Sequence, residues 1–169
     1  MKYRITKYNS QYRVENGAYS VDDWTSVGEI GKEFNGTKLS LEMYLRVEKK
    51  YLDSISIIFK NFNSKNIIVK KMEKYFSFEE IKKKTFDMPY SKTEKIFKKA
   101  KNEMILDLDE ALILATLVLR ELIWCEFTDI NNKFKIQFGY DYYMYCVCDN
   151  LKKNSIKKIE ELGLFVDIM

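Results

Sequence analysis

The 169-residue sequence contains no histidine, one proline, six glycines and three cysteines. Without histidine, this chain by itself has no Ser-His or Cys-His nucleophile, no imidazole base and no histidine-ligated metal site. The glycines are scattered and form neither a GxGxxG nor a GxxxxGK phosphate-binding loop, and there is no nucleophile elbow. The sequence therefore favours a binding protein over an enzyme, and we expect no cofactor.

The cysteines Cys125, Cys146 and Cys148 are odd in number, which disfavours a disulfide framework and favours a reducing compartment. Cys146 and Cys148 are one residue too close for a CxxC redox or zinc pattern, so we expect buried thiols and no bound metal. The most apolar run, 111–119, is shorter than the ~20 residues of a membrane helix, and the first residues lack the apolar segment of a secretory signal. We expect a cytoplasmic protein without a membrane segment.

Hydrophobic residues make up 46% of the chain and charged residues 32%, which is typical of a soluble globular protein. The length fits a single domain that comprises residues 1–169. Helical spacing of apolar residues predicts a long helix over 41–61 with Ser40 as its N-cap. Capping-box spacings that begin at Ser77 and Asp107 predict two further helices, 77–84 and 108–122. Shorter helices are predicted at 92–101 and 155–162.

Alternating apolar and polar residues, or short β-branched runs, predict several strands. These strands are expected at 3–8, 67–69, 123–128, 133–138, 142–148 and 164–168. Three of them follow one another directly and predict an antiparallel meander. The predicted fold class is α+β, with a helix-rich N-terminal part packed on a C-terminal antiparallel β-meander.

Charge is distributed unevenly along the chain. Residues 60–101 carry 13 lysines and 5 acidic residues, whereas residues 102–150 carry 3 basic and 9 acidic residues. Such segregation can steer a charged partner, although lysine-rich helices are often just solvated faces. The basic segment contains no arginine and no recognised nucleic-acid-binding signature, so nucleic acid is an unlikely partner. A nucleic-acid-associated role would use Lys82, Lys83, Lys84, Lys95, Lys98, Lys99 and Lys101.

The acidic segment, residues 102–150, contains charged and aromatic residues that are not needed to form a hydrophobic core. Helix capping accounts for three of the acidic residues, Asp107, Asp109 and Glu110. Three others lie on or beside the predicted meander, namely Glu126, Asp129 and Asp141. Even positions from Phe134 to Cys148 are apolar or aromatic, so the even face should be buried and Tyr143 and Tyr145 exposed. An acidic and aromatic face of this kind suits binding to a basic cleft. The predicted partner-binding residues are Glu126, Asp129, Asp141, Tyr143 and Tyr145.

Two parts of the chain resemble an uncharacterised family of small bacterial proteins. The resemblance at the beginning rests on Tyr3-Arg-Ile-Thr-Lys-Tyr-Asn9, Arg13, Gly17-Ala-Tyr19, Asp23-Trp-Thr-Ser26 and Ile30-Gly31. At the end it rests on Phe138-Gly-Tyr-Asp-Tyr-Tyr-Met-Tyr145 and Ile156-Lys-Lys-Ile-Glu-Glu-Leu-Gly-Leu-Phe-Val166. The lysine-rich middle is unmatched, and no catalytic residue is carried over. The chain also resembles the small single-domain proteins that serve as immunity proteins in bacterial toxin systems.

Three hypotheses follow. The leading one is a non-catalytic immunity protein that neutralises a cognate toxin domain by direct binding and occlusion of its active site. The alternative is a nucleic-acid-associated protein that uses the lysine-rich segment 60–101. An enzyme that works through a pair of carboxylates is the third, and no spacing in the sequence favours it. The oligomeric state is left open.

Overall fold

The computed structural model describes all 169 residues and has an α+β fold, as predicted from the sequence. Seven strands form one antiparallel sheet in the order β5-β4-β6-β7-β8-β1-β9. The strands are β1 (Lys2–Thr6), β4 (Asn66–Lys74), β5 (Ile105–Asp107), β6 (Ile123–Asp129), β7 (Phe134–Phe138), β8 (Met144–Cys148) and β9 (Phe165–Ile168). The helices are α1 (Leu41–Asn61), α2 (Phe78–Lys84), α3 (Tyr90–Lys99), α4 (Leu108–Leu119) and α5 (Lys153–Glu161).

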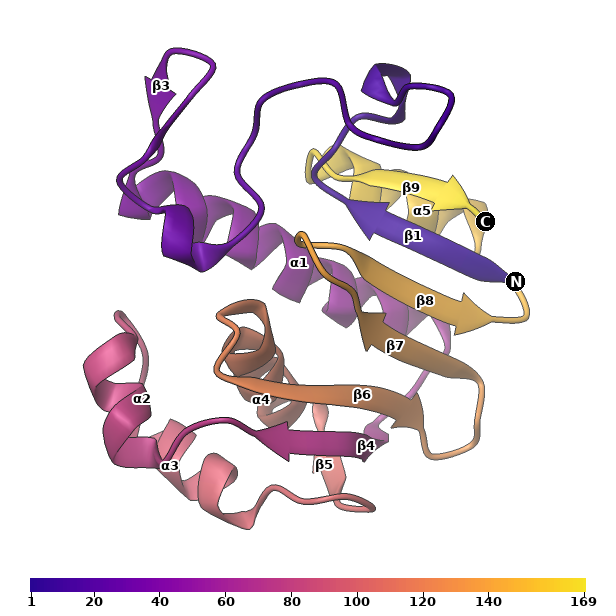
Figure 1. Cartoon of the computed structure of the whole chain (residues 1–169). Helices are drawn as coiled ribbons and strands as arrows, with labels where there is room; N and C mark the ends of the chain where they lie inside the picture. The colour runs from indigo at the N-terminus through magenta and orange to yellow at the C-terminus, as the bar shows by residue number, and fades with distance from the viewer.

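Helices α1, α4 and α5 cover one face of the sheet and lie behind it in Figure 1, while α2 and α3 lie beside α4. No helix covers the opposite face. The segment between β1 and α1 contains two short 3-10 helices, Ser10–Tyr12 and Val27–Glu29, and a small hairpin. That hairpin consists of β2 (Glu33–Phe34) and β3 (Thr37–Lys38).

Helices α1, α2 and α4 start at the predicted capping signals, whereas α3 and α5 have no side-chain cap and begin two residues earlier than predicted. Helix α1 has the predicted bounds, and its N-cap Ser40 accepts a hydrogen bond from the Met43 amide at 3.1 Å. Capping boxes are present at Ser77 and at Asp107, where each side chain satisfies an amide of the first helical turn. Because α4 is apolar on most of its surface, it is buried between the sheet and the other helices.

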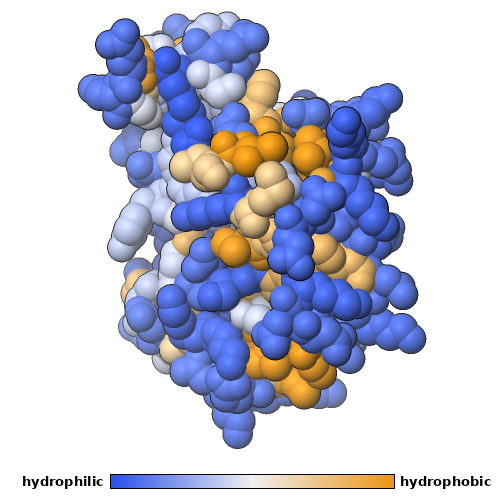
Figure 2. All heavy atoms as spheres, turned by 90° about the vertical axis from the view of Figure 1, so that its right-hand side faces the viewer, coloured by the Kyte–Doolittle hydropathy of each residue, from blue (hydrophilic) through white to orange (hydrophobic).

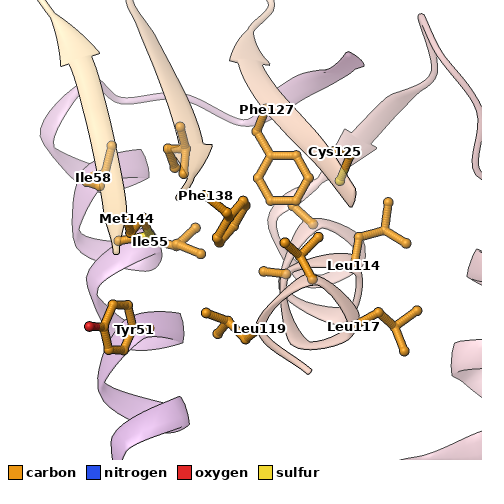
Figure 3. Close-up of a cluster of buried hydrophobic side chains, with 14 of the residues drawn as sticks. Tyr51, Ile55, Ile58, Leu114, Leu117, Leu119, Cys125, Phe127, Phe138 and Met144 are labelled. Atoms are coloured by element: carbon orange, nitrogen blue, oxygen red, sulfur yellow. The ribbon is translucent and has the colours of Figure 1, made fainter. Parts of the chain in front are cut away.

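The core consists of one cluster of 37 buried residues. Figure 3 shows how α1 and α4 present apolar side chains to the strands of the meander. Those labelled on α1 and α4 are Tyr51, Ile55, Ile58, Leu114, Leu117 and Leu119; those on the strands are Cys125, Phe127, Phe138 and Met144. Removing this apolar surface from water supplies the main driving force for folding.

The predicted alternation of the meander is confirmed at all but one position. Seven of the eight even positions are buried, namely Phe134, Ile136, Phe138, Tyr142, Met144, Cys146 and Cys148. Tyr140 is the exception, because it lies in the turn between β7 and β8 and is 89% exposed.

The helices are interspersed among the strands rather than collected before them. Strand β4 follows α1 and is longer than predicted, because pairing with β6 extends it through a bulge between Lys70 and Glu73. Strand β5 was not predicted, since its three residues carry too little local signal. Both strands depend on long-range pairing that no local pattern encodes.

The molecular side that carries both chain termini is mostly hydrophilic. Figure 2 shows separate groups of hydrophobic residues there, divided by hydrophilic ones rather than joined into one apolar surface. None of the helices has both the length and the apolar character needed to cross a membrane.

Candidate functional site

Asp129 ends β6 and is fully buried. Its carboxylate accepts hydrogen bonds from the Ser64 hydroxyl at 2.5 Å and from the amides of Asn131 and Lys133 at 2.9 and 3.2 Å. Asp129 therefore fixes the β6–β7 turn. This corrects the expectation that it contributes to an exposed acidic face.

Glu126 is also buried, on the helix-free face of the sheet. Its carboxylate contacts Lys71 Nζ at 3.0 Å and Gln137 Nε2 at 2.9 Å, and Lys135 Nζ lies 4.0 Å away. Burial alone would raise the pKa of Glu126, but the hydrogen bonds from Lys71 and Gln137 and the two lysine charges lower it overall. Its charge is neutralised within the chain, so Glu126 offers little attraction to a partner.

Tyr143 and Tyr145 lie on the same face, as predicted, but both are half-buried rather than exposed. The Tyr143 hydroxyl accepts a hydrogen bond from Arg13 Nη1 at 2.9 Å, and its ring packs 5.4 Å from that of Tyr8. Lys2 Nζ lies 4.2 Å from the ring centre of Tyr145. Both rings are thus largely occupied by intramolecular contacts.

Asp141 is exposed and lies at the tip of the β7–β8 hairpin. The turn is closed by a hydrogen bond from the Tyr143 amide to the Tyr140 carbonyl at 3.2 Å. Asp141 and Tyr142 both have positive φ, 55° and 63°, which is typical of a type I′ turn. Asn-Gly is the usual pair at these positions, and a bulky residue such as tyrosine is strained there.

Core contacts hold Tyr142 in this strained conformation. Its hydroxyl donates to the Tyr44 hydroxyl at 2.8 Å, and its carbonyl accepts a hydrogen bond from the Tyr51 hydroxyl at 2.6 Å. Its ring also packs edge-on against Trp24, with ring centres 5.0 Å apart. The anchored Tyr142 fixes the turn, and Tyr140 and Asp141 project from it into solvent.

Beside this turn the sheet splits. Strands β6 and β7 pair at only two positions, Phe127 with Ile136 and Thr128 with Lys135, and then diverge (Figure 1). A cleft of about 310 Å³ lies at the split, between the start of β6, the end of α4 and the β7–β8 turn. Ligand sites have volumes of roughly 300–1,000 Å³, so the cleft is large enough for a single side chain or a small molecule.

The cleft is rich in aromatic residues. Six of its twelve lining residues are aromatic, namely Tyr75, Trp124, Phe138, Tyr140, Tyr142 and Tyr143. Tyr75, Trp124 and Tyr140 have no aromatic ring and no cation packed against them, although the chain forms nine cation–π contacts on other rings, two of them on Tyr143. Three aromatic rings are therefore available to a ligand. We call these twelve residues the aromatic cleft.

The aromatic cleft carries two carboxylates, Glu121 and Asp141, and no lysine or arginine lines it. Neither carboxylate forms a hydrogen bond or an ion pair within the chain. Although Glu121 as a whole residue is exposed, partial burial of its carboxylate raises its pKa, and the negative charges of Asp141 and Glu29 raise it further. The cleft therefore has a negative electrostatic character that the protein leaves uncompensated.

A buried ion pair positions the α4 end of the cleft. Arg120 follows α4, and its Nε and Nη2 contact the two carboxylate oxygens of Glu48 at 2.8 and 2.7 Å. Arg120 also donates to the Thr85 hydroxyl at 3.0 Å and to the Phe86 carbonyl. This network ties α1, the end of α4 and the α2–α3 connection together, and it supports the backbone that presents Glu121.

The lysine-rich segment is partly neutralised. Among the seven lysines proposed for nucleic-acid contact, Lys82 pairs with Glu79, Lys98 with Glu94 and Lys99 with Glu110, each at 2.5–2.7 Å. Lys74, nearby in the same segment, is exposed and donates to the Phe97 carbonyl at 2.7 Å. Three of the seven lysines are thus paired with carboxylates, and the other four, Lys83, Lys84, Lys95 and Lys101, form no ion pair.

The three cysteines are free and buried, and the sulfurs of Cys146 and Cys148 are 3.8 Å apart. Burial raises the pKa of the Cys125 thiol, with a smaller contribution from the charge of Glu126. No group of three or more Cys, Asp or Glu side chains is arranged to hold a metal ion.

Of the five residues predicted to bind a partner, only Asp141 and Tyr143 line the aromatic cleft. The sequence reasoning missed Glu121, Trp124, Tyr75 and Tyr140. They come from three segments of the chain, around 75, 121–124 and 140, which come together only in the folded protein. One local signal was available for Glu121, since it is a carboxylate two residues after the most apolar helix.

Comparison of the chain with family models, with curated proteins and with solved structures gives no match.

Proposed function

We propose that this chain is a non-catalytic binding protein, and more specifically an immunity protein that neutralises a cognate toxin domain by direct binding and active-site occlusion. The observation that supports this proposal most is the aromatic cleft with its two unpaired carboxylates, Glu121 and Asp141. Aromatic residues are enriched at the centres of protein interfaces, and complementary charge sets their specificity.

The shape of the turn also supports a role in binding. Tyr140 is 89% exposed on a turn that Tyr142 anchors in the core. A rigid turn loses little conformational entropy on binding, and tyrosine is a frequent hot-spot residue. Backbone strain of the kind found at Tyr142 costs about 1–3 kcal/mol and is most often retained at functional sites.

An acidic, aromatic projection is suited to a basic active site. Enzymes that act on nucleic acids present lysine and arginine to phosphates, so a negatively charged surface competes for the same groups. The cytoplasm is the compartment proposed for this interaction, because the chain has three free thiols.

The test is co-expression with the proteins encoded immediately beside this chain. We expect one of them to arrest growth when expressed alone, to be tolerated when this chain is present, and to form a stoichiometric complex with it in size-exclusion chromatography. The proposal is wrong if no neighbouring product is toxic, or if growth is rescued without any complex.

A further inference from the structure

We propose that the aromatic cleft is the receptor for an arginine side chain of the protein partner, with the guanidinium held between the rings of Trp124, Tyr75 and Tyr140 and the carboxylates of Glu121 and Asp141. This inference rests on the proposed function for the source of the arginine. The recognition chemistry rests on the cleft alone.

The aromatic rings supply the first part of the argument. Cations bind over aromatic faces, most strongly over tryptophan, and the effect is larger where water is excluded. Trp124 is half-buried and has no cation or ring against it, and the same lack of partners holds for Tyr75 and Tyr140. The chain stacks its own guanidinium groups on other rings, with Arg120 over Phe86 at 4.5 Å and Arg13 over the cleft residue Tyr143 at 5.3 Å.

The two carboxylates of the cleft also favour a cationic ligand. Glu121 and Asp141 carry charges close enough for Asp141 to raise the pKa of Glu121, and no positive residue lines the cleft to separate them. A cation placed between them would relieve this repulsion. Arginine fits better than lysine, because its planar guanidinium can stack on a ring and donate to carboxylates at the same time.

The inner wall of the cleft suits the apolar stem of an arginine side chain. Its inner wall is apolar and buried, with Val118, Leu119 and Ile123 all at most 6% exposed. An arginine side chain has an apolar stem and a charged head, so the stem can pack against this wall while the head reaches the carboxylates at the rim.

The test uses the folded, full-length chain and a small probe, Nα-acetyl-arginine amide, followed by two-dimensional amide NMR. We expect shifts of the Trp124 indole N–H and of the Glu121, Gly139 and Asp141 amides, with a Kd on the order of 1 mM. Nα-acetyl-citrulline amide, which has nearly the same shape without the charge, should bind at least ~10-fold more weakly. Nα-acetyl-lysine amide should be intermediate between the two.

Two variants locate the site. Glu121→Gln and Asp141→Asn keep shape and hydrogen-bonding capacity but remove one charge each, and asparagine tolerates the positive φ at position 141. Each should weaken arginine binding about 3–10-fold, whereas Glu160→Gln on α5, also an exposed and unpaired carboxylate, should not change it. The unchanged spectrum outside the cleft reports that the variants are folded.

Three results overturn the inference: equal binding of the arginine and citrulline probes, no shifts at the cleft up to about 20 mM probe, or full binding retained in the Glu121→Gln, Asp141→Asn double variant. Failure of the proposed function is distinguishable, because arginine would then bind the cleft while no neighbouring gene product is toxic. A toxin complex that both variants leave unchanged would refute the arginine receptor and leave the immunity role intact.

Discussion

Glu121, after the end of α4, and Asp141, in the β7–β8 turn, line the same cleft, and neither carboxylate has a positive partner. Asp141 is held at the tip of a strained turn, and Glu121 follows the most apolar helix. Other charged groups of the sheet are paired, for example Glu126 with Lys71 and Arg4 with Asp167. The two cleft carboxylates differ from these groups because they have no counter-charge, and this difference can be tested.

Replacement of Glu121 by glutamine should stabilise the protein at neutral pH. The pKa of Glu121 is raised in the folded state, first by burial and then by Asp141 and Glu29, so its ionised form opposes folding. This unfavourable contribution is fully present above the raised pKa and disappears as the pH falls below the unfolded-state pKa of about 4.3. Urea unfolding should show a higher midpoint for Glu121→Gln at pH 7 and a shrinking difference toward pH 4. A lower midpoint at pH 7 would show that Glu121 is structural.

Disruption of the Arg120–Glu48 pair should be strongly destabilising. Glu48→Gln leaves the guanidinium buried without its counter-charge, a change that typically costs about 3–5 kcal/mol. The double variant Glu48→Leu, Arg120→Met removes both charges and should be more stable than the sum of the single variants predicts. Denaturant unfolding of Glu48→Leu, Arg120→Met and the double variant measures the coupling, and strict additivity would contradict it.

Asp129→Ala should reduce stability without affecting a partner. The substitution removes the acceptor of the Asn131 and Lys133 amides and of the Ser64 hydroxyl, and loss of each of these partly buried bonds costs about 1 kcal/mol. The free energy of unfolding should therefore fall. Under conditions where the variant is still folded, its binding of the arginine probe should be unchanged. Weaker binding of the arginine probe by the folded variant would show that Asp129 takes part in binding.

The fold was predictable where local signals are strong. Ser40, Ser77 and Asp107 mark helix starts through their own side-chain chemistry, and the period-2 pattern from Phe134 to Cys148 identifies the buried face of the meander. The extension of β4 beyond Val69 was not predictable, since it depends on pairing with β6 and on a bulge with positive φ at Lys71.

The site was predictable only in part. Charge and aromatic content pointed to Asp141 and Tyr143, but the same criteria included Glu126 and Asp129, whose carboxylates are buried and paired. Composition does not distinguish a carboxylate that stabilises a turn from one that faces a ligand. The cleft itself depends on the divergence of β6 from β7, which places Trp124 beside Glu121 and Tyr140.

The alternative role of the lysine-rich segment has a direct test. Because Lys82, Lys98 and Lys99 are ion-paired, we expect no binding of mixed DNA or RNA tighter than roughly 10 μM at physiological salt. Fluorescence anisotropy with labelled oligonucleotides measures this. Submicromolar binding that weakens steeply with salt would favour the nucleic-acid role over the immunity role.

The central claim is that the aromatic cleft binds the partner, and the most direct measurement is calorimetric titration of the cognate toxin domain with the Tyr140→Ala, Asp141→Asn double variant. Tyr140 is preferred to Tyr143 because it has no intramolecular ring or cation contact, so its removal leaves the fold intact. A hot spot of about 2 kcal/mol at Tyr140, together with the roughly 3–10-fold effect of Asp141→Asn, predicts a loss of affinity of roughly 100-fold. The control, Lys98→Glu with Lys99→Glu, should change affinity far less. Normal binding by the cleft variant, together with loss of binding in the lysine variant, would contradict the account.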